Sequence, residues 1–355
     1  MKICFFNCAK VWGGGEKWHL DNANALAKKG HQIVVVSNID SELLKRANND
    51  NLRTKAFNIS NLSFLSPFKR HGIYRFFEAE KFDVLVMNFS KDLKTAACAA
   101  KKAGIKRIIY RRGSDIPIKN SMLNRYLFGK CITDIIANSE ATKRSILLNN
   151  NDLFPAEKII VLYNGISFNG FENIKEEHNT PVIGTIGRLS YQKRHDLLVS
   201  IAKKLHDKNI DCHFIIGGDG ELKNKIRKQI ADNHLENYVE MSGFVNNPHE
   251  FLQQTDIFIL TSEWEGFGYV LAEAMRARKP IVAFNTSSIP ELIEDNKNGF
   301  LIPWNDTEAF ADALIALLKD KKKREEMGDC GYNYALQKFD FEKNQEFLID
   351  YFLKG

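Results

Sequence analysis

The sequence predicts an α/β protein built from two doubly wound domains, each with its own parallel sheet. Its 355 residues suit two domains of ordinary size. Short apolar runs without polar alternation, typical of strands buried in parallel sheets, alternate with helical sequence in two successive series. A polar stretch separates the two series. We therefore expect a first domain at 1–168, a linker at 169–180, a second domain at 181–338 and a closing helix at 339–355.

The expected strands follow the apolar runs in chain order. In the first domain they are 2–6, 33–37, 82–87, 107–110, 134–137 and 158–162. In the second domain they are 181–186, 213–216, 239–242, 257–261, 280–284 and 300–302. Ligands of doubly wound sheets bind beyond the carboxyl ends of the strands, so two such domains predict a central cleft between them.

Composition and charge narrow the class of protein. Hydrophobic residues make up 44% and charged residues 26%, near the average for soluble chains, and no apolar run is long enough to span a membrane. The six cysteines are scattered, so we expect reduced thiols in a cytoplasmic protein. The net charge is +6, but positions 91–130 hold eleven basic and two acidic residues, so this stretch carries +9 and the rest −3. This surplus predicts peripheral contact with an anionic inner membrane surface. No recognition motif indicates nucleic acid.

The stretch 260–280 predicts a phosphate site, because it reads as a strand, a glycine loop and a helix that starts near Gly268. The first N–H groups of a helix have no partner within it and can hold an anion without a basic side chain. Glu265 and Glu273 lie on either side of this helix start, and carboxylates accept strongly from hydroxyls. We infer a ligand with hydroxyls at both ends and phosphate between them, such as a nucleotide-sugar. The alternative is a solvated glutamate pair.

The same stretch, E-G-F-G-Y-V-L-A-E, resembles the E-x7-E signature of the retaining group 1 glycosyltransferases, which have the GT-B fold. The resemblance implies two Rossmann-like domains facing a central cleft, with a last helix that crosses back to the first domain. It implies that Glu265 binds the transferred sugar, that Glu273 binds the ribose and that the donor is a UDP- or GDP-sugar. The residues whose N–H groups would meet sugar and phosphate are Gly266, Phe267, Gly268, Tyr269 and Val270.

A second motif, G-R-L-S-Y-Q-K, follows the strand 181–186 and is similar to the family's diphosphate-binding pattern. The resemblance makes Arg188 and Lys193 the diphosphate ligands. Fixed cations there would stabilise the charge that develops on the leaving diphosphate. The alternative is two exposed bases at a helix start. No D-x-D after a strand and no His/Cys cluster indicates a metal, so we expect neither a metal nor another cofactor.

Two further loops of the second half resemble donor-binding segments. I-I-G-G-D-G-E-L would place Gly218 beside the nucleotide, and S-G-F-V would place Phe244 and Val245 against its base. A tight strand-to-helix turn explains the glycine loop equally well, and burial in the core explains the apolar pair. The later P-E motif is preceded by Thr286, Ser287 and Ser288, where the family has glycines.

The first half contributes a glycine loop and two arginines. W-G-G-G-E departs from the dinucleotide fingerprint G-x-G-x-x-G, which disfavours a dehydrogenase. In the resembled family a G-G-x-E here lies near donor phosphates and acceptor, which assigns Gly14 and Gly15 to the donor and Glu16 to the acceptor. An ordinary tight turn is the alternative. Many family members have His-Asp where this chain has R-R-G-S-D, and we hypothesise that Arg111 or Arg112 recognises an anionic acceptor group. The alternative is a basic patch facing a membrane.

The resemblance implies a retaining enzyme that moves a hexose from a nucleoside-diphosphate sugar to a glycan or glycolipid acceptor. We expect it at the inner face of a bacterial membrane, in cell-surface polysaccharide or lipopolysaccharide synthesis. The alternatives are a nucleotide-sugar hydrolase or epimerase of the same fold, and a donor-binding scaffold without activity.

Overall fold

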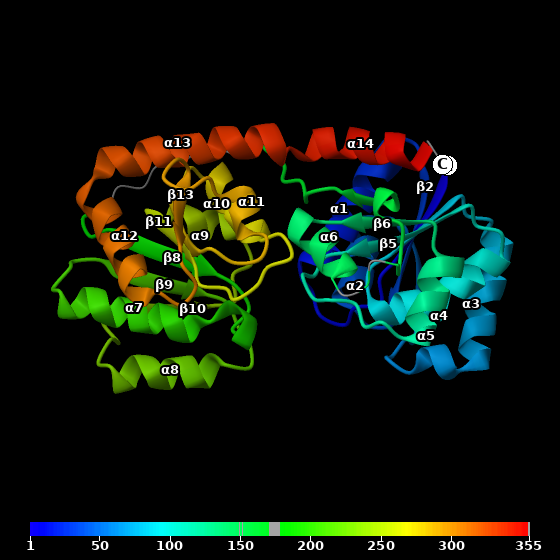
Figure 1. Cartoon of the computed structure of the whole chain (residues 1–355), viewed down its shortest axis with the longest axis horizontal. Coiled ribbons are helices and arrows are strands. Elements are labelled where there is room, and N and C mark those ends of the chain that lie inside the picture. Colours follow the sequence, from blue (N-terminus) through cyan, green and yellow to red (C-terminus); the bar gives the residue numbers. More distant parts are fainter. Residues whose placement is uncertain (149, 151, 170–177, 354–355) are drawn as a thin grey trace. The chain divides into compact units, whose positions relative to one another are not determined.

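The computed structural model describes residues 1–148, 150, 152–169 and 178–353, which fall into two compact units (Figure 1). The first unit is Met1–Asn164 with Glu342–Gly355, and the second is Gly165–Phe341. Most of the expected linker, positions 170–177, lies outside the described residues. No helix among the described residues has both the length and the apolar character that crossing a bilayer requires.

The first unit is a parallel sheet of seven strands in the order β3-β2-β1-β4-β5-β6-β7. The strands are β1 Lys2–Phe6, β2 Gln32–Asn38, β3 Arg53–Phe57, β4 Val84–Met87, β5 Arg107–Arg112, β6 Asp134–Ala137 and β7 Ile159–Val161. The α-helices are α1 Gly14–Lys28, α2 Glu42–Asn49, α3 Pro67–Glu80, α4 Ser90–Lys102, α5 Met122–Tyr126, α6 Glu140–Leu147 and α14 Phe341–Leu353. Short 3-10 turns η1 Ser63–Leu65 and η3 Ala156–Lys158 and the π-turn η2 Leu127–Cys131 complete the unit.

Both faces of this sheet are covered, which explains why its strands are apolar throughout. Along β1, Cys4 and Phe6 belong to one hydrophobic cluster, whereas Ile3 and Phe5 belong to another. Successive side chains of a strand point to opposite faces, so the two clusters are the cores on the two sides of the sheet. The expected αβ alternation is confirmed for the six predicted strands of this unit.

The edge strand β3 is missing from the sequence-based prediction. Its residues Arg53–Phe57 are exposed or only half-buried, and its pairing with β2 leaves its other edge without a strand neighbour in the sheet. Arg53 pairs with Glu80 of α3, Nη2 to Oε1 at 2.6 Å. A strand with polar side chains at a sheet edge carries no apolar run, which is the signal that identified its neighbours.

The second unit is a parallel sheet of six strands in the order β10-β9-β8-β11-β12-β13. The strands are β8 Val182–Ile186, β9 His213–Gly217, β10 Val239–Gly243, β11 Ile257–Leu260, β12 Ile281–Phe284 and β13 Gly299–Ile302. The helices are η4 Tyr191–Lys193, α7 His195–Asp207, α8 Lys223–Asp232, α9 Pro248–Gln253, α10 Tyr269–Arg276, α11 Ile289–Leu292, α12 Thr307–Lys319 and α13 Lys321–Lys338. In both sheets the chain reverses its direction of strand addition once, between β1 and β4 and between β8 and β11.

The last helix, α14, packs within the first unit. Leu348 and Phe352 are buried in the same cluster as β1 residues Ile3 and Phe5. Tyr351 closes the contact, because its carbonyl accepts from Arg107 Nη1 at 2.9 Å and its hydroxyl donates to Asp134 Oδ1 at 2.9 Å. Phe347, next to Leu348 on the same helix, is 47% exposed.

We expect Leu348→Ala to destabilise the first unit by about 2–5 kcal/mol, because it removes fully buried atoms and leaves a cavity. Phe347→Ala on the same helix is the matched control and should change stability by about 0.5 kcal/mol or less. Hydrogen exchange of first-unit peptides under mild denaturant measures the difference. Equal effects of the two substitutions would contradict the packing of α14 described above.

Candidate functional site

The switch point of the second sheet brings two separate loops together. β8 and β11 are neighbours in the sheet, although β9 and β10 lie between them in sequence. The loops that leave their carboxyl ends therefore meet at one edge, the usual ligand position in doubly wound sheets. Lys193 lies after β8 and Glu265 lies after β11, and their Nζ and Oε1 atoms are 2.5 Å apart. Their side chains are only 14% and 8% exposed, so the pair is largely buried.

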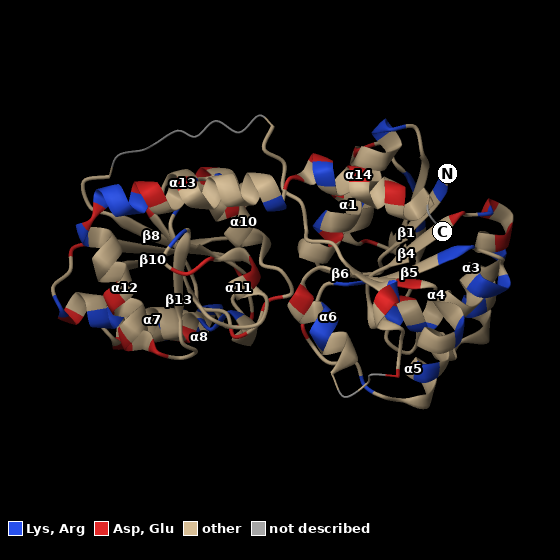
Figure 2. Ribbon diagram, turned by 45° about the horizontal axis from the view of Figure 1, so that its top comes forward, with Lys and Arg blue, Asp and Glu red and all other residues tan. Residues whose placement is uncertain are grey.

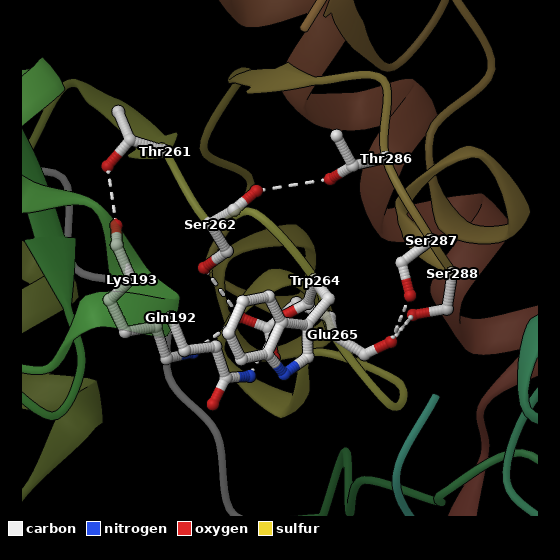
Figure 3. Close-up of polar contacts among 9 residues, drawn as sticks. All are labelled: Gln192, Lys193, Thr261, Ser262, Trp264, Glu265, Thr286, Ser287 and Ser288. Atoms are coloured by element: carbon white, nitrogen blue, oxygen red, sulfur yellow. Dashed lines mark hydrogen bonds and ion pairs between the residues drawn. The ribbon is translucent and has the colours of Figure 1, made fainter. Parts of the chain in front are cut away.

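Hydroxyl groups fix the loop that carries Glu265 (Figure 3). Ser262 Oγ donates to Glu265 Oε1 at 2.7 Å, which orients the carboxylate. The hydroxyls of Ser287 and Ser288 donate to the Glu265 carbonyl at 2.6 and 3.0 Å, and Thr286 Oγ1 donates to the Ser262 carbonyl at 3.1 Å. The three residues that replace the family's glycines thus anchor the glutamate loop. Sequence reasoning missed this role, although three adjacent hydroxyls after strand β12 are a visible signal.

Backbone and side-chain contacts tie the lysine loop to the glutamate loop (Figure 3). Thr261 Oγ1 donates to the Lys193 carbonyl at 2.8 Å, and Gln192 Nε2 donates to the Trp264 carbonyl at 2.7 Å. The Glu263 amide also donates to the Gln192 carbonyl at 2.8 Å. These bonds hold the backbone on both sides of the ion pair, so the positions of the two charges are set before any ligand arrives.

The helix after Glu265 begins where the sequence predicts. Gly268 has φ of +86°, a left-handed conformation that favours glycine, and α10 starts at the next residue, Tyr269. Gly266 is partly exposed, as are Tyr269 and Val270 in the first helical turn. Phe267 points into the core instead: it is 2% exposed and meets the Phe339 ring at 5.2 Å. Phe267 can therefore offer a ligand only its backbone.

The other predicted donor residues of this helix and of the lysine loop lie in different surroundings. Glu273 is 8% exposed on α10. Burial lowers the pKa of the nearby Arg276 guanidinium, and the Glu273 carboxylate partly opposes that shift. Arg188 is exposed, and its Nη2 lies 3.3 Å from Glu221 Oε2. The structure thus brings Lys193, and not Arg188, to Glu265. The ion pair between Arg188 and Glu221 is exposed and therefore weak, so Arg188 can change its partner at little cost.

The glycine loop after β9 contacts the neighbouring loop closely. A Cβ on Gly218 would lie 1.9 Å from the Gly187 carbonyl oxygen, and one on Gly217 would lie 2.5 Å from Val245 Cγ2. Glycine at these two positions is therefore required by close contacts with neighbouring segments. Val245 packs against Gly217, whereas Phe244 is 65% exposed. Phe244 is thus an exposed aromatic side chain at this edge.

In the first unit, the switch point between β1 and β4 gathers a buried polar cluster. Glu16 is 4% exposed and accepts from Asn7 Nδ2 at 3.1 Å. Burial raises the pKa of the Glu16 carboxyl, while the Asn7 hydrogen bond and the Arg111 charge oppose the shift. Arg111 is 2% exposed and donates to Asn88 Oδ1 at 3.0 Å and to Asn164 Oδ1 at 2.8 Å.

A tryptophan ring and two glycines complete this cluster. The Arg111 guanidinium carbon lies 4.8 Å from the centre of the Trp18 ring, a cation–π contact. Gly14 opens α1, and a Cβ on Gly15 would lie 2.6 Å from Asn88 Nδ2. Sequence reasoning missed the asparagines of this cluster, although Asn7 and Asn88 each directly follow a buried strand.

The two predicted acceptor arginines point to opposite sides of the first sheet. Arg112 Nη1 donates to the Tyr110 hydroxyl at 3.2 Å, and its Nη2 donates to the Ile116 carbonyl at 2.5 Å. Arg111 lies on the other face and belongs to the cluster with Glu16. Within the described residues, no group of three or more His, Cys, Asp and Glu side chains is arranged to hold a metal ion.

Comparisons with known proteins identify the family and the fold. The family model described as glycosyl transferases group 1 matches residues 169–334, and that described as glycosyltransferase family 4 matches residues 12–169. The crystal structure of Anabaena Alr3699/HepE in complex with UDP superposes on the chain with a TM-score of 0.86. The identity is 22%, and the match covers 100% of both chains.

Curated relatives point to the same family. Poly(ribitol-phosphate) alpha-N-acetylglucosaminyltransferase of Staphylococcus aureus is 28% identical over 75% of this chain. The match spans only 53% of that relative's own length. UDP-Gal:alpha-D-GlcNAc-diphosphoundecaprenol alpha-1,3-galactosyltransferase of Escherichia coli is 28% identical over 74% of this chain and 73% of its own. The two family models together cover residues 12–169 and 169–334, and the fold is shared. The chain therefore belongs to the group 1, or family 4, glycosyltransferases, a family of retaining enzymes with the GT-B fold.

Proposed function

We propose that the protein transfers a hexose, with retention of configuration, from a nucleoside-diphosphate sugar to a glycan or lipid-linked acceptor. The observation that carries the proposal is the buried Lys193–Glu265 pair at the switch point of the second sheet. When the bond between sugar and phosphate breaks, negative charge develops on the diphosphate. Lys193 and the first N–H groups of α10 then stabilise that charge more strongly than the ground state.

The remaining donor contacts follow from the same edge. We assign Glu265 to a hydroxyl of the transferred sugar, because its second carboxylate oxygen remains to accept after Oε1 has bonded Lys193 and Ser262. Glu273 is assigned to the ribose hydroxyls and exposed Phe244 to the base. Arg188 would leave Glu221 and join the diphosphate when the donor binds. The loop of Gly218 shapes this edge through its contact with Gly187.

We place the acceptor on the first unit, at the cluster of Glu16 and Arg111. Two relatives carry phosphate in their named acceptors, a poly(ribitol-phosphate) and a diphosphoundecaprenol. An anionic acceptor of this kind suits the buried arginine beside Glu16. We infer a role in cell-surface polysaccharide or lipopolysaccharide synthesis at the inner face of the membrane, where lipid-linked acceptors are presented.

A screen of UDP-, GDP- and ADP-sugars for thermal stabilisation tests the donor assignment. A donor at 100 times its dissociation constant should add about 2.7 kcal/mol to the unfolding free energy. Product analysis with and without lipid acceptors then separates transfer from hydrolysis or epimerisation. Stabilisation without any turnover would favour a donor-binding scaffold.

We expect Lys193→Met to lower kcat by about 10²- to 10³-fold, because it removes the charge nearest the leaving diphosphate. It also leaves the Glu265 carboxylate buried without a cation, which costs about 3–5 kcal/mol of stability. The double variant Lys193→Met/Glu265→Gln should recover most of this stability and none of the activity. Lys228→Met on the exposed α8 surface is the control. Recovery of activity together with stability would assign the pair a structural role only.

We expect sugar transfer to continue in excess EDTA, because Lys193 and the α10 N–H groups would supply the positive charge that a divalent ion provides elsewhere. Initial rates are measured with and without added Mg²⁺ after exhaustive chelation. A loss of rate in EDTA that Mg²⁺ restores would overturn the proposed arrangement around the diphosphate.

Arg111→Lys should raise the KM for the acceptor by about tenfold while donor affinity stays unchanged, because lysine keeps the charge without the guanidinium fork. The matched change Arg112→Lys lies on the opposite face of the sheet and should leave that KM near the wild-type value. Steady-state kinetics at saturating donor give both values. Equal effects of the two changes would remove Arg111 from the acceptor site.

A further inference from the structure

One face of the first unit exposes apolar side chains that its core does not use. Leu62, Leu65 and Phe68 are 68%, 65% and 87% exposed, and they recur every third residue through η1 and the start of α3. Leu62 and Leu65 lie one turn apart across η1, and Phe68 lies in the first turn of α3, after the extended residue Ser66. Exposed apolar side chains occur singly on most proteins, but three large ones so close in the chain indicate an interaction surface.

A second apolar group lies on α5. Met122, Leu123 and Tyr126 are 85%, 36% and 55% exposed, and none of the five residues of this helix is buried. The helix is started by its cap, where Ser121 Oγ accepts from the Asn124 amide at 3.2 Å. A helix without a fully buried side chain gains little packing energy from the fold. Its apolar side chains therefore suit a partner outside the chain.

The two groups belong to elements that cover the same face of the first sheet. One hydrophobic cluster on that face contains residues of α3, α4 and η2. η2 follows α5 directly in the chain. α4 also contacts the elements on both sides of it, because Lys94 Nζ lies 5.6 Å from the Phe64 ring centre and Lys101 Nζ donates to the Lys130 carbonyl. We call Leu62, Leu65, Phe68, Met122, Leu123 and Tyr126, with the bases around them, the η1–α5 surface.

The charge of the η1–α5 surface is mainly positive. Positions 60–77 and 116–133 contain no aspartate or glutamate. Their lysines and arginines are Lys69, Arg70, Arg75, Lys119, Arg125 and Lys130, of which Arg75 pairs with Glu78, Nη1 to Oε2 at 3.1 Å. The single acid of α4, Asp92, is buried and accepts from the Cys8 and Phe89 amides. Figure 2 shows basic residues on α3 and α5. Apolar side chains among a surplus of bases complement an anionic leaflet with an acyl interior.

We propose that the η1–α5 surface docks on an anionic lipid bilayer, with Phe68 and Met122 inserted among the acyl chains and the surrounding bases against the headgroups. The inference deepens the proposed function, because such docking would present the first unit to a lipid-linked acceptor. The docking proposal rests on the exposure and charge of side chains in the first unit alone. Docking can therefore occur even if the protein transfers no sugar. Aliphatic side chains between the bases favour a bilayer over nucleic acid, which takes aromatic stacking platforms.

The test is co-sedimentation of the full chain with vesicles of phosphatidylglycerol and phosphatidylcholine, in the absence of donor. We expect binding to the mixed vesicles, release by high salt and no binding to pure phosphatidylcholine. Phe68→Ser and Met122→Ser should each weaken partitioning roughly tenfold or more. Lys119→Gln and Arg125→Gln should each weaken it roughly fivefold. The controls are Leu336→Ser, a 36% exposed leucine of α13, and Lys228→Gln on α8.

Unfolding midpoints and UDP affinity of every variant show whether a loss of vesicle binding reflects misfolding. Wild-type partitioning of Phe68→Ser and Met122→Ser, equal binding to neutral vesicles, or no binding at all would each overturn the proposal. A dimer that Phe68→Ser dissolves would also overturn it, because the surface would then be an interface between copies. Vesicle binding without turnover would contradict only the proposed function, and turnover without vesicle binding would contradict only the docking.

Discussion

The ion pair between Lys193 and Glu265 is the interaction on which the candidate donor site depends. Both charged groups are largely buried, so removing either one would leave the other buried without a counter-charge, which destabilises the protein. Ser262 orients the carboxylate, and Ser287 and Ser288 hold its backbone. The result is a cation and an acceptor oxygen at fixed positions beside a helix start. Preorganised charge of this kind needs little rearrangement when a polar substrate arrives.

Topology explains why such a pair exists at all. Residues 72 positions apart in sequence meet because the sheet adds strands first on one side of β8 and then on the other. The first sheet does the same around β1, where Glu16, Asn88 and Arg111 gather. Each unit thus places buried polar groups at its switch point, beyond the carboxyl ends of the strands.

Much of the fold could be predicted from the sequence, and less of the site. Twelve apolar runs marked twelve of the thirteen strands, while polar β3 gave no such signal. The glutamate, lysine and glycine motifs placed residues beyond the carboxyl ends of strands, since αβ alternation makes the strands parallel and brings those ends to one edge. Side-chain direction could not be predicted. Phe267 turns into the core, Arg188 pairs with Glu221, and the Gly218 loop meets another loop, because each depends on neighbours distant in sequence.

The two arginines at the end of β5 carry a consequence for how this family can diverge. They are adjacent in sequence, yet one joins the polar cluster and the other bonds Tyr110 on the opposite side. A shift of one residue within β5 would therefore move each arginine to the opposite face of the sheet. After one deletion upstream, the second arginine would take the cluster position; after one insertion, Tyr110 would take it, and the cluster would lose its guanidinium although the R-R pair is kept.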